Sequence, residues 1–306
     1  MRKIKKKIIK GLLAVKPFIE LLSRKIEAVV ANEESVNKKE AETLWPWNHQ
    51  VKQFPPTMPS GKPWPKISIV TPSYNQGQYI EETIRSVLLQ GYPNLEYIVF
   101  DGGSTDNTLM ILNRYQSEIN VCISEPDSGQ SHALNKGFSL ATGEILAWLN
   151  SDDLYCPNTM RDVALAFDSQ STDIVVGGCQ IIKNYSRFPS TTSHHCILPM
   201  NQVILLPFEK ILDFQGSWLK GDFFFQPEVF WTKQIWDTVG GRVDQNLHFA
   251  LDYEFWLRLA RANARVLHIP EDLAMFRMHD TQKTSWTLAL SDFPEYTEVI
   301  RRFSEG

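Results

Sequence analysis

The chain has 306 residues, 43% of them hydrophobic and 22% charged, a composition typical of a soluble globular protein and unlike that of a disordered or fibrous chain. The formal net charge is −4, but residues 1–25 hold nine Lys or Arg against one acid, so the remaining residues carry −12. An acidic body argues against nucleic-acid binding, which needs a basic surface to neutralise phosphates. Four cysteines without a CxxC pair predict reduced thiols and a cytoplasmic protein.

Residues 1–43 are the basic end of the chain. Apolar residues recur there near helical spacing, with lysines between them, at Ile4, Ile8, Leu12, Val15, Ile19 and Leu22. This pattern predicts a basic amphipathic helical extension, which either lies on the anionic inner face of a membrane or is a solvated terminal helix. Six prolines at 44–65 predict a semi-rigid linker, so we expect the folded domain to begin near Lys66.

Strand and helix patterns alternate between residues 66 and 153. Short apolar runs at 66–71, 95–100, 121–124 and 144–149 predict strands, and helical spacing around 80–88, 108–115 and 130–141 predicts the helices between them. Such alternation predicts an α/β fold with an open, mostly parallel sheet flanked by helices. Polar or acidic side chains follow every predicted strand. Because ligands bind beyond the carboxyl ends of parallel strands, we expect the binding site at this edge.

Two common phosphate-binding loops are absent from the sequence. No GxGxxG motif follows the first predicted strand, and no GxxxxGK[ST] motif occurs in the chain, which excludes a dinucleotide site of the Rossmann type and a P-loop. A sugar nucleotidyltransferase also binds nucleotides on an open α/β sheet. That alternative would need a loop rich in glycine and basic residues after the first strand, and residues 71–77 supply none.

Four segments of the chain resemble the family 2 inverting glycosyltransferases, which have a GT-A fold. The segments are IVTPSYNQGQYIEETIRSVLLQGYPNLEYIVFDGGSTDNT, SEPDSGQSHALNKGFSLATGEILAWLNSDD, FFFQPEVFWTKQIWDTVGG and ALDYEFWLRLA, within residues 66–280. The resemblance implies transfer of a sugar from a nucleotide-diphosphate sugar donor to a carbohydrate or lipid-linked acceptor. It also implies a divalent cation, Mg²⁺ or Mn²⁺, and a place in polysaccharide or glycan biosynthesis.

We therefore expect a GT-A catalytic domain over 66–290 and a C-terminal helix at 291–306. The domain would have a nucleotide-sugar half at 66–153 and an acceptor half at 154–290. Residues 173–178 and 180–182 are expected to continue the sheet. Residues 186–222 lack clear periodicity and are expected to form a flexible acceptor loop. His194 and His195 in that stretch lack metal-ligand spacing, and we expect them to be solvated.

The resemblance implies which residues contact the donor base and nucleoside. Pro72 and Tyr74 match the segment that closes over the base. Asp101 matches a nucleoside-binding acid, although an acid at a strand end also forms Asx turns. Gly102 replaces the second acid, which meets uracil in some family members, so the resemblance does not fix uridine as the base. Asp127 matches a second donor-facing loop.

Other residues match positions around the donor phosphates. Asn135 and Lys136 lie on the helix behind the Asp127 loop, and the positive end of that helix would help to hold the phosphates. Gln226 matches a motif near the acceptor side of the pocket. Arg277 and His279 match a loop that closes on the diphosphate, where Arg277 would contact phosphate and His279 phosphate or metal.

Residues 150–153 (NSDD) occupy the position of the family's DxD motif. The cation needs oxygen ligands because it bridges the diphosphate and neutralises the leaving group. Asn150 replaces the first acid of the motif, which leaves Asp152 as the expected direct ligand and Asp153 as a donor-contacting neighbour. An acid just before a helix also serves as an N-cap, and this alternative stays open for Asp153.

Asp252 matches the general base that takes the proton of the acceptor hydroxyl. Phe255, Trp256 and Leu259 would form the apolar face of its helix and aim Asp252 into the cleft, where the helix dipole favours the ionised carboxylate. Glu254 and Arg258 are spaced as an i,i+4 ion pair.

Two departures from the family pattern leave one alternative open. Asn150 and Gly102 both stand where the family has acids, so the chain could be an inactive nucleotide-sugar-binding protein. The presence of Asp152 and Asp252 favours an active enzyme.

Overall fold

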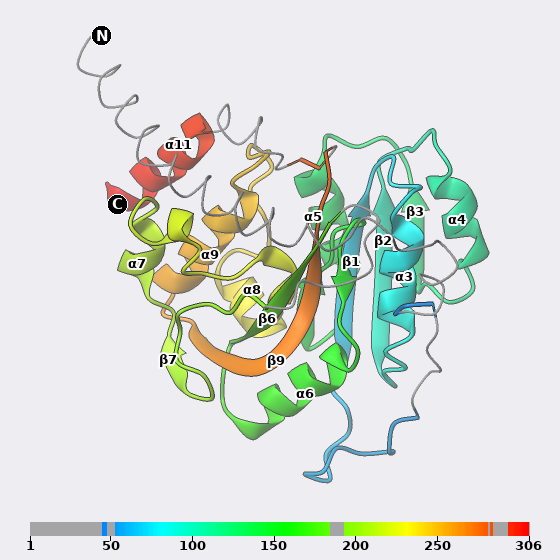
Figure 1. Ribbon diagram of the computed structural model, residues 1–306, viewed down its shortest axis with the longest axis horizontal. Helices are drawn as coiled ribbons and strands as arrows, with labels where there is room; N and C mark the ends of the chain where they lie inside the picture. The colour runs from blue at the N-terminus through cyan, green and yellow to red at the C-terminus, as the bar shows by residue number, and fades with distance from the viewer. Residues whose placement is uncertain (1–44, 48–52, 184–192, 281, 284–292, 306) are drawn as a thin grey trace.

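The computed structural model describes residues 45–47, 53–183, 193–280, 282–283 and 293–305. A nine-stranded sheet runs through the molecule and helices flank it (Figure 1). The strand order is β3-β2-β1-β4-β8-β6-β9-β5, and β7 pairs with β9. The predicted α/β fold is confirmed. The predicted basic extension at 1–43 lies outside the described residues.

The first half of the sheet is parallel, as predicted. Its strands are β1 (Ile67–Ser73), β2 (Leu95–Asp101), β3 (Val121–Ser124) and β4 (Ile145–Trp148), and these four strands pair with one another in parallel. The helices between them are α3 (Ile80–Leu88), α4 (Thr108–Arg114) and α5 (Gln130–Leu140). Every residue of β1 and β4 is buried. This burial explains why their sequences are continuous apolar runs and do not alternate between apolar and polar residues.

Strand β1 is longer than predicted. Pro72 pairs with Phe100 and Ser73 with Asp101, so both residues belong to the strand rather than to the loop after it. The pairing of β1 with β4 ends at Val70 and Trp148. Pro72 therefore lies where β1 is paired on one side only, and a residue without an N–H is tolerated there.

The second half of the sheet is mixed. It contains β5 (Leu154–Tyr155), β6 (Ile174–Lys183), β7 (Val203–Leu205), β8 (Val229–Thr232) and β9 (Arg265–Met278). Strand β8 is antiparallel to both β4 and β6, while β6 and β9 are parallel. The helical elements of this half are α6 (Thr159–Ser169), α7 (Phe208–Leu212), η1 (Trp218–Lys220), η2 (Gln226–Glu228), α8 (Lys233–Thr238), α9 (Leu251–Arg261) and α11 (Phe293–Ser304).

The long strand β9 corrects one expectation. Residues 276–278 are expected to begin a loop, but Phe276, Arg277 and Met278 are the end of β9, paired with Ile181, Ile182 and Lys183 of β6. The pairing contains a bulge: Val176 pairs with His268, whereas Cys179 already pairs with Ala274. Gly177 lies at the bulge, and a Cβ there would be 2.5 Å from the carbonyl oxygen of Glu271, so only glycine allows this approach of the strands.

The proline-rich segment packs against the domain where it is described. Met58 and Trp64 are buried in the main hydrophobic core. The Trp64 indole Nε1 donates to the carbonyl of Pro55 at 2.9 Å, and its ring meets those of Phe54 and Tyr92 edge to face. The prolines predict a linker, but the aromatic and apolar residues between them supply the surface that attaches the segment to the domain.

Aromatic side chains attach α9 to the sheet. Phe255 and Trp256 are fully buried, and the Trp256 ring stacks on Trp148 of β4 with centroids 6.0 Å apart. Trp231 of β8 contacts both Phe255 and Trp256. The predicted apolar face of this helix is thus confirmed, and it fixes the helix that carries Asp252.

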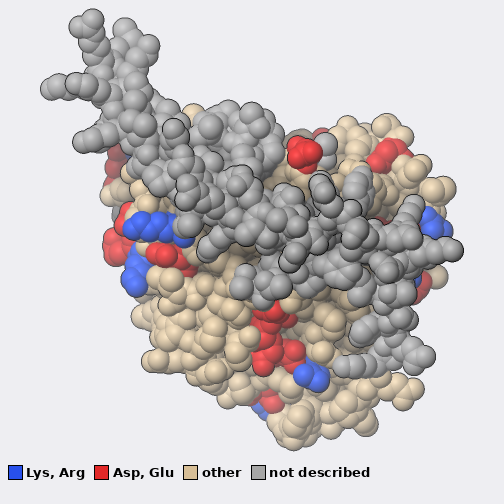
Figure 2. All heavy atoms as spheres, in the orientation of Figure 1, with Lys and Arg blue, Asp and Glu red and all other residues tan. Residues whose placement is uncertain are grey.

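The described surface is charged in patches. Figure 2 shows basic and acidic side chains close together over α7, and acidic side chains gathered over β9 and α6. Among the described residues, no helix has the length and apolar character needed to cross a membrane.

Candidate active site

The loop between β4 and β5 presents one acid next to a histidine. Asp152 lies at the turn of this loop, and its Oδ2 is 3.0 Å from Nε2 of His279, just beyond the end of β9. The His279 side chain is 1% exposed, and its ring packs against Tyr79 with centroids 4.5 Å apart. Two residues that are 127 positions apart thus meet at the carboxyl end of β4, as the sequence predicts for a site at this edge of the sheet.

Asp153 points into the protein beside Asp152. Its Oδ1 accepts from the backbone N–H of Arg277 at 2.9 Å, and its backbone carbonyl accepts from the Thr83 hydroxyl. Burial raises the pKa of the Asp153 carboxyl well above its usual value, with the negative charge of Asp152 adding to the effect and Arg277 opposing it. Asp153 is not an N-cap, because α6 begins six residues later at Thr159, after Asn158.

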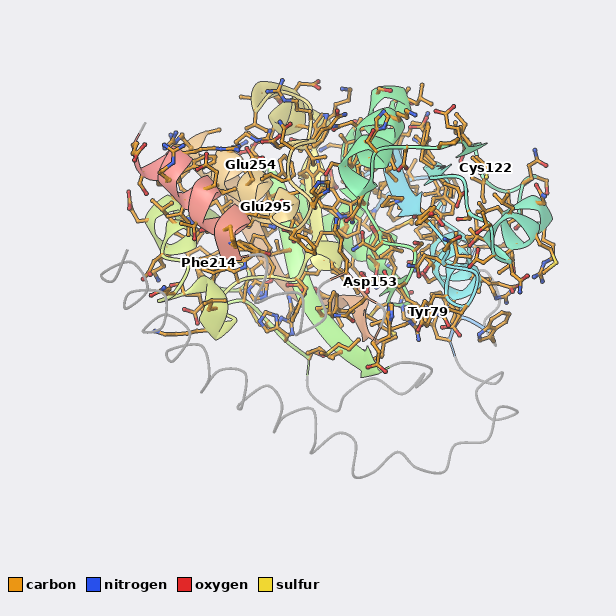
Figure 3. The ribbon with its side chains drawn as sticks, turned by 90° about the horizontal axis from the view of Figure 1, so that it is seen from above. Tyr79, Cys122, Asp153, Phe214, Glu254 and Glu295 are labelled. Carbon is orange, nitrogen blue, oxygen red and sulfur yellow. The ribbon has the colours of Figure 1, made fainter. Side chains whose placement is uncertain are left out.

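Arg277 is committed to the protein itself. Its Nε donates to the backbone carbonyl of Asp152 at 2.9 Å, its Nη2 pairs with Glu82 of α3, and its guanidinium lies over the Tyr79 ring. Arg277 is 2% exposed. Figure 3 labels Asp153 and Tyr79 in this part of the molecule. These contacts give Arg277 and Asp153 a supporting position around the Asp152 loop, and their expected contact with the donor stays a prediction.

A chain of polar side chains leads from the buried end of β4 to Lys283. Gln226 donates to the carbonyl of Trp148 at 2.8 Å and accepts from Asn150 at 3.2 Å. Asn150 Oδ1 accepts from Gln130 at 2.8 Å, and Gln130 Oε1 accepts from the Lys283 ammonium at 2.8 Å. The structure thus brings the predicted residue Gln226 to the acid loop.

Gln130 and Lys283 were missed by the sequence reasoning as site residues. Gln130 is the first residue of α5, directly after Gly129, and Lys283 lies four residues after His279. Their positions next to motif residues were the available signal. Neither side chain belongs to an acid cluster or a glycine-rich loop, which are the patterns that draw attention in a sequence.

Asp252 is the second residue of α9. Its Oδ1 accepts from the N–H of Tyr253 at 2.7 Å. Burial raises the pKa of the Asp252 carboxyl to about 6, although the positive charge of Lys283 opposes the shift. The helix dipole predicts a shift in the other direction, so the desolvation of this partly buried group outweighs the dipole. The predicted Glu254–Arg258 ion pair on the same helix is confirmed, with a distance of 2.8 Å.

Asp101 is held by its own turn. The carboxylate is 1% exposed and accepts from the N–H of Ser104 at 2.9 Å and from the Ser124 hydroxyl at 2.7 Å. These hydrogen bonds are the ones expected from the alternative interpretation, in which Asp101 forms an Asx turn. Its role in binding the nucleoside stays a prediction.

Gly102 and Asp127 lie against each other. A Cβ on Gly102 would be 3.0 Å from Oδ2 of Asp127, so the Asp127 carboxylate takes up the space that a side chain at position 102 would need. Asp127 also accepts from the N–H of Gly129 at 2.7 Å. An acid is therefore present beside position 102, although it comes from a different loop.

The remaining predicted donor residues have varied surroundings. Tyr74 is 62% exposed, whereas Pro72 is buried in β1. Asn135 bonds the backbone of Val243 through both ends of its amide, and Lys136 pairs with Glu125 at 2.6 Å. The contacts of Asn135 and Lys136 connect elements of the protein and do not reach the Asp152 loop.

His194 and His195 differ from the expectation that they are solvated. Nε2 of His194 is 2.8 Å from the carbonyl oxygen of Gly221, and Nδ1 of His195 is 3.1 Å from Nε2 of His268. Both side chains are partly buried, and the stretch that carries them bridges to β6 at Cys179.

In the described part of the chain, possible metal-ligating side chains lie together in pairs and not in larger groups. Within this part of the chain, no three His, Cys, Asp or Glu side chains are arranged to hold a metal ion. Asp152 and His279 fit a cation that takes its other ligands from a substrate, because magnesium-type sites are commonly built from one or two protein ligands plus phosphate oxygens. The carboxylate of Asp152 suits Mn²⁺ as well as Mg²⁺.

The fold, with acidic side chains at this edge of the sheet, is that of the GT-A class of glycosyltransferases. Residues 68–235 match the family described as Glycosyl transferase family 2. A Rickettsia typhi protein described as an uncharacterized glycosyltransferase is 30% identical over 243 residues, which is 78% of this chain and 71% of that protein. The chain belongs to glycosyl transferase family 2, and the family predicted from its sequence is confirmed.

One further relative also has solved structures that match this chain. Staphylococcus aureus TarS, described as a poly(ribitol-phosphate) beta-N-acetylglucosaminyltransferase, is 31% identical over 116 residues, 36% of this chain and 20% of that protein. The crystal structure of TarS 1-349 in complex with UDP-GlcNAc has a TM-score of 0.59 at 19% identity and covers 78% of this chain and 66% of that one. Another crystal structure of S. aureus TarS is matched over 39% of its chain.

A mannosyltransferase from Pyrobaculum calidifontis, PcManGT, was solved in complex with GDP-Man and Mn²⁺. It has a TM-score of 0.54 at 19% identity, over 94% of this chain and 76% of that one. At these identities the two structures establish the shared fold, and the protein is a glycosyltransferase by its family.

Proposed function

We propose that this glycosyltransferase is an inverting, metal-dependent hexosyltransferase that moves a sugar from a nucleotide-diphosphate sugar to an acceptor hydroxyl. The observation that carries the proposal is the pairing of Asp152 with His279, together with a second carboxylate, Asp252, whose pKa is raised to about 6. The Asp152–His279 pair suits the diphosphate end of a donor, and the Asp252 carboxylate suits proton transfer near neutral pH.

The proton goes to Asp252 in this scheme. As the acceptor oxygen bonds to the anomeric carbon, its proton passes to the carboxylate of Asp252, and the bond from that carbon to the diphosphate breaks with its electron pair on the leaving oxygen. A single displacement of this kind inverts the anomeric configuration. A base with a pKa near the working pH is ionised often enough to accept the proton and basic enough to hold it.

Asp152 and His279 would hold the cation. A bound Mg²⁺ or Mn²⁺ would supply positive charge to the diphosphate and so stabilise the leaving group. Arg277 and Asp153 orient Asp152, because the guanidinium bonds the Asp152 carbonyl and the Asp153 carboxylate bonds the Arg277 amide. The ammonium of Lys283 is held by Gln130 and adds a further positive charge to this region. Its charge also limits the rise in the pKa of the Asp252 carboxyl.

The relatives support the substrate classes. TarS was solved with UDP-GlcNAc and PcManGT with GDP-Man, so we propose a nucleotide-diphosphate hexose as the donor. The name of TarS describes a polymeric polyol acceptor, which supports an acceptor that is part of a polysaccharide, glycan or related surface polymer. We keep Pro72, Tyr74, Asp101, Asp127, Asn135 and Lys136 as proposed residues around the donor.

Product configuration tests the proposed reaction. We expect the enzyme to release nucleoside diphosphate from one member of a panel of UDP- and GDP-hexoses when Mn²⁺ is present, and an α-linked donor to give a β-linked product in NMR spectra. Product with the donor's configuration would contradict the inverting mechanism. Nucleotide binding without transfer to any acceptor would favour the inactive binding protein instead.

We also propose that the basic residues 1–43 attach the enzyme to the inner face of the membrane. Deleting residues 1–30 should leave transfer intact and weaken binding to anionic vesicles. The difference from the full chain should shrink as salt is added, because salt screens the attraction between the lysines and the lipid. Equal sedimentation of both proteins with the vesicles would contradict this attachment.

A further inference from the structure

Three consecutive backbone N–H groups before α9 converge on one carboxylate. His248 N donates to Oε1 of Glu295 at 2.8 Å, and Phe249 N and Ala250 N both donate to Oε2 at 2.7 Å. Ala250 is the N-cap residue of α9 and its side chain cannot accept a hydrogen bond. The turn that leads into this helix is therefore held by a residue 45 positions away in the sequence from Ala250.

A carboxylate suits this position for two physical reasons. Successive backbone N–H groups that point the same way form a concavity that binds anions. The N-terminal end of a helix also carries partial positive charge, which a negative side chain offsets. An uncharged group could satisfy some of the donors but would leave the charge uncompensated.

The helix that carries Glu295 is fixed on the same part of the domain. Tyr296, the next residue of α11, packs against Phe214 with ring centroids 4.7 Å apart and against Tyr253 of α9 at 5.6 Å. Val299 is fully buried. Arg261 at the end of α9 donates to the carbonyl of Phe303 at the end of α11. Figure 3 shows Glu295 on α11 where this helix lies beside α9.

We propose that Glu295 is a positioning residue for Asp252. It holds the turn 248–250, which leads directly into the first turn of α9 where Asp252 lies. The Asp252 carboxylate is bonded by backbone N–H groups of this first turn, that of Tyr253 and its own. The direction of its carboxylate therefore depends on where this helix begins. This inference rests on the proposed role of Asp252 as the base.

The experiment compares Glu295→Gln with a matched control on the same helix, Glu298→Gln. Glu298 pairs with Arg301 and Arg302 at the surface and does not contact α9 in the described structure. We expect Glu295→Gln to lower kcat by about 10- to 100-fold, because a displacement of about 1 Å costs up to that factor. The donor KM and the Mn²⁺-dependent thermal shift with nucleoside diphosphate should stay at the wild-type values, and Glu298→Gln should match wild type in every measurement.

A double variant separates positioning from general loss of structure. If Glu295 acts through Asp252, adding Glu295→Gln to Asp252→Asn should lower kcat no further, because the two groups act as one unit. Additive losses, a wild-type kcat in Glu295→Gln, or loss of nucleotide binding together with kcat would overturn the proposal. If Glu295→Gln does not fold, Glu295→Asp, which keeps the charge on a shorter side chain, is judged by the same criteria.

The design distinguishes this inference from the function on which it depends. Normal turnover in Asp252→Asn would remove the proposed base, whatever Glu295→Gln does. Impaired turnover in Asp252→Asn with unaffected turnover in Glu295→Gln would leave the base in place and reject the role of Glu295 alone.

Discussion

Replacing Asp252 by Asn is expected to lower kcat by about 10²–10⁴, the usual contribution of a general base. The amide keeps the size of the side chain and its place in the first turn of α9, but it cannot take the acceptor proton. Donor binding should survive, because Asp252 has no contact with the Asp152 loop among the described residues. Transfer kinetics with saturating donor, together with the thermal shift produced by nucleoside diphosphate and Mn²⁺, measure both effects.

The pH dependence of the wild-type enzyme provides the control. The base works only when ionised, so kcat/KM should fall as the pH drops through about 6, the value to which burial raises the pKa of Asp252. Asp252→Asn should lack this acidic limb. An unchanged limb in the variant would assign it to another group, and simultaneous loss of donor binding would make Asp252 a donor-site or structural acid.

Replacing Asp152 by Ala should lower transfer by about 10³-fold or more. Stabilisation of the leaving group by a bound cation is worth several kcal/mol, and each 1.4 kcal/mol is a factor of ten in rate. The variant should also lose the part of the nucleotide thermal shift that depends on Mn²⁺, since mass action stabilises only a protein that binds the ligand.

Asn150→Ala is the matched control for Asp152→Ala. Both residues belong to the same loop, but Asn150 offers only a neutral amide oxygen, which is occupied by Gln130. The loss of transfer should therefore be smaller than for Asp152→Ala. A folded Asp152→Ala variant that kept the full Mn²⁺-dependent shift would rule out Asp152 as a metal ligand.

The first half of the fold could be predicted because its signals are local. Each strand of β1 to β4 is a short apolar run bounded by polar residues, and burial on both faces requires such runs. The second half depends on contacts between distant residues. Nothing local in the sequence at Phe276–Met278 shows that these residues pair with β6, and the prolines before Lys66 gave no sign that Trp64 is buried between Phe54 and Tyr92.

Candidate site residues could be named from single motifs, whereas contacts between distant motifs could not be predicted. Asp152 and His279 could be named from motifs, and the structure brings them together. The sequence could not show that Arg277 would be neutralised by Glu82, because the two residues are 195 positions apart. Nor could it give the direction of the pKa shift at Asp252, which depends on how much water the surrounding residues exclude.

The bulge opposite Gly177 has a geometric consequence for the site. Between the pairs Val176–His268 and Cys179–Ala274, β6 advances by three residues while β9 advances by six. The excess is odd, and side chains alternate between the two faces of a strand. After the bulge, the alternation of side chains along β9 relative to β6 is therefore inverted. This inversion sets the face of the sheet on which Arg277 lies near the Asp152 loop. Removing a single residue between His268 and Ala274 would turn Arg277 and His279 to the opposite face together, so the length of this short stretch determines whether the two side chains reach the Asp152 loop.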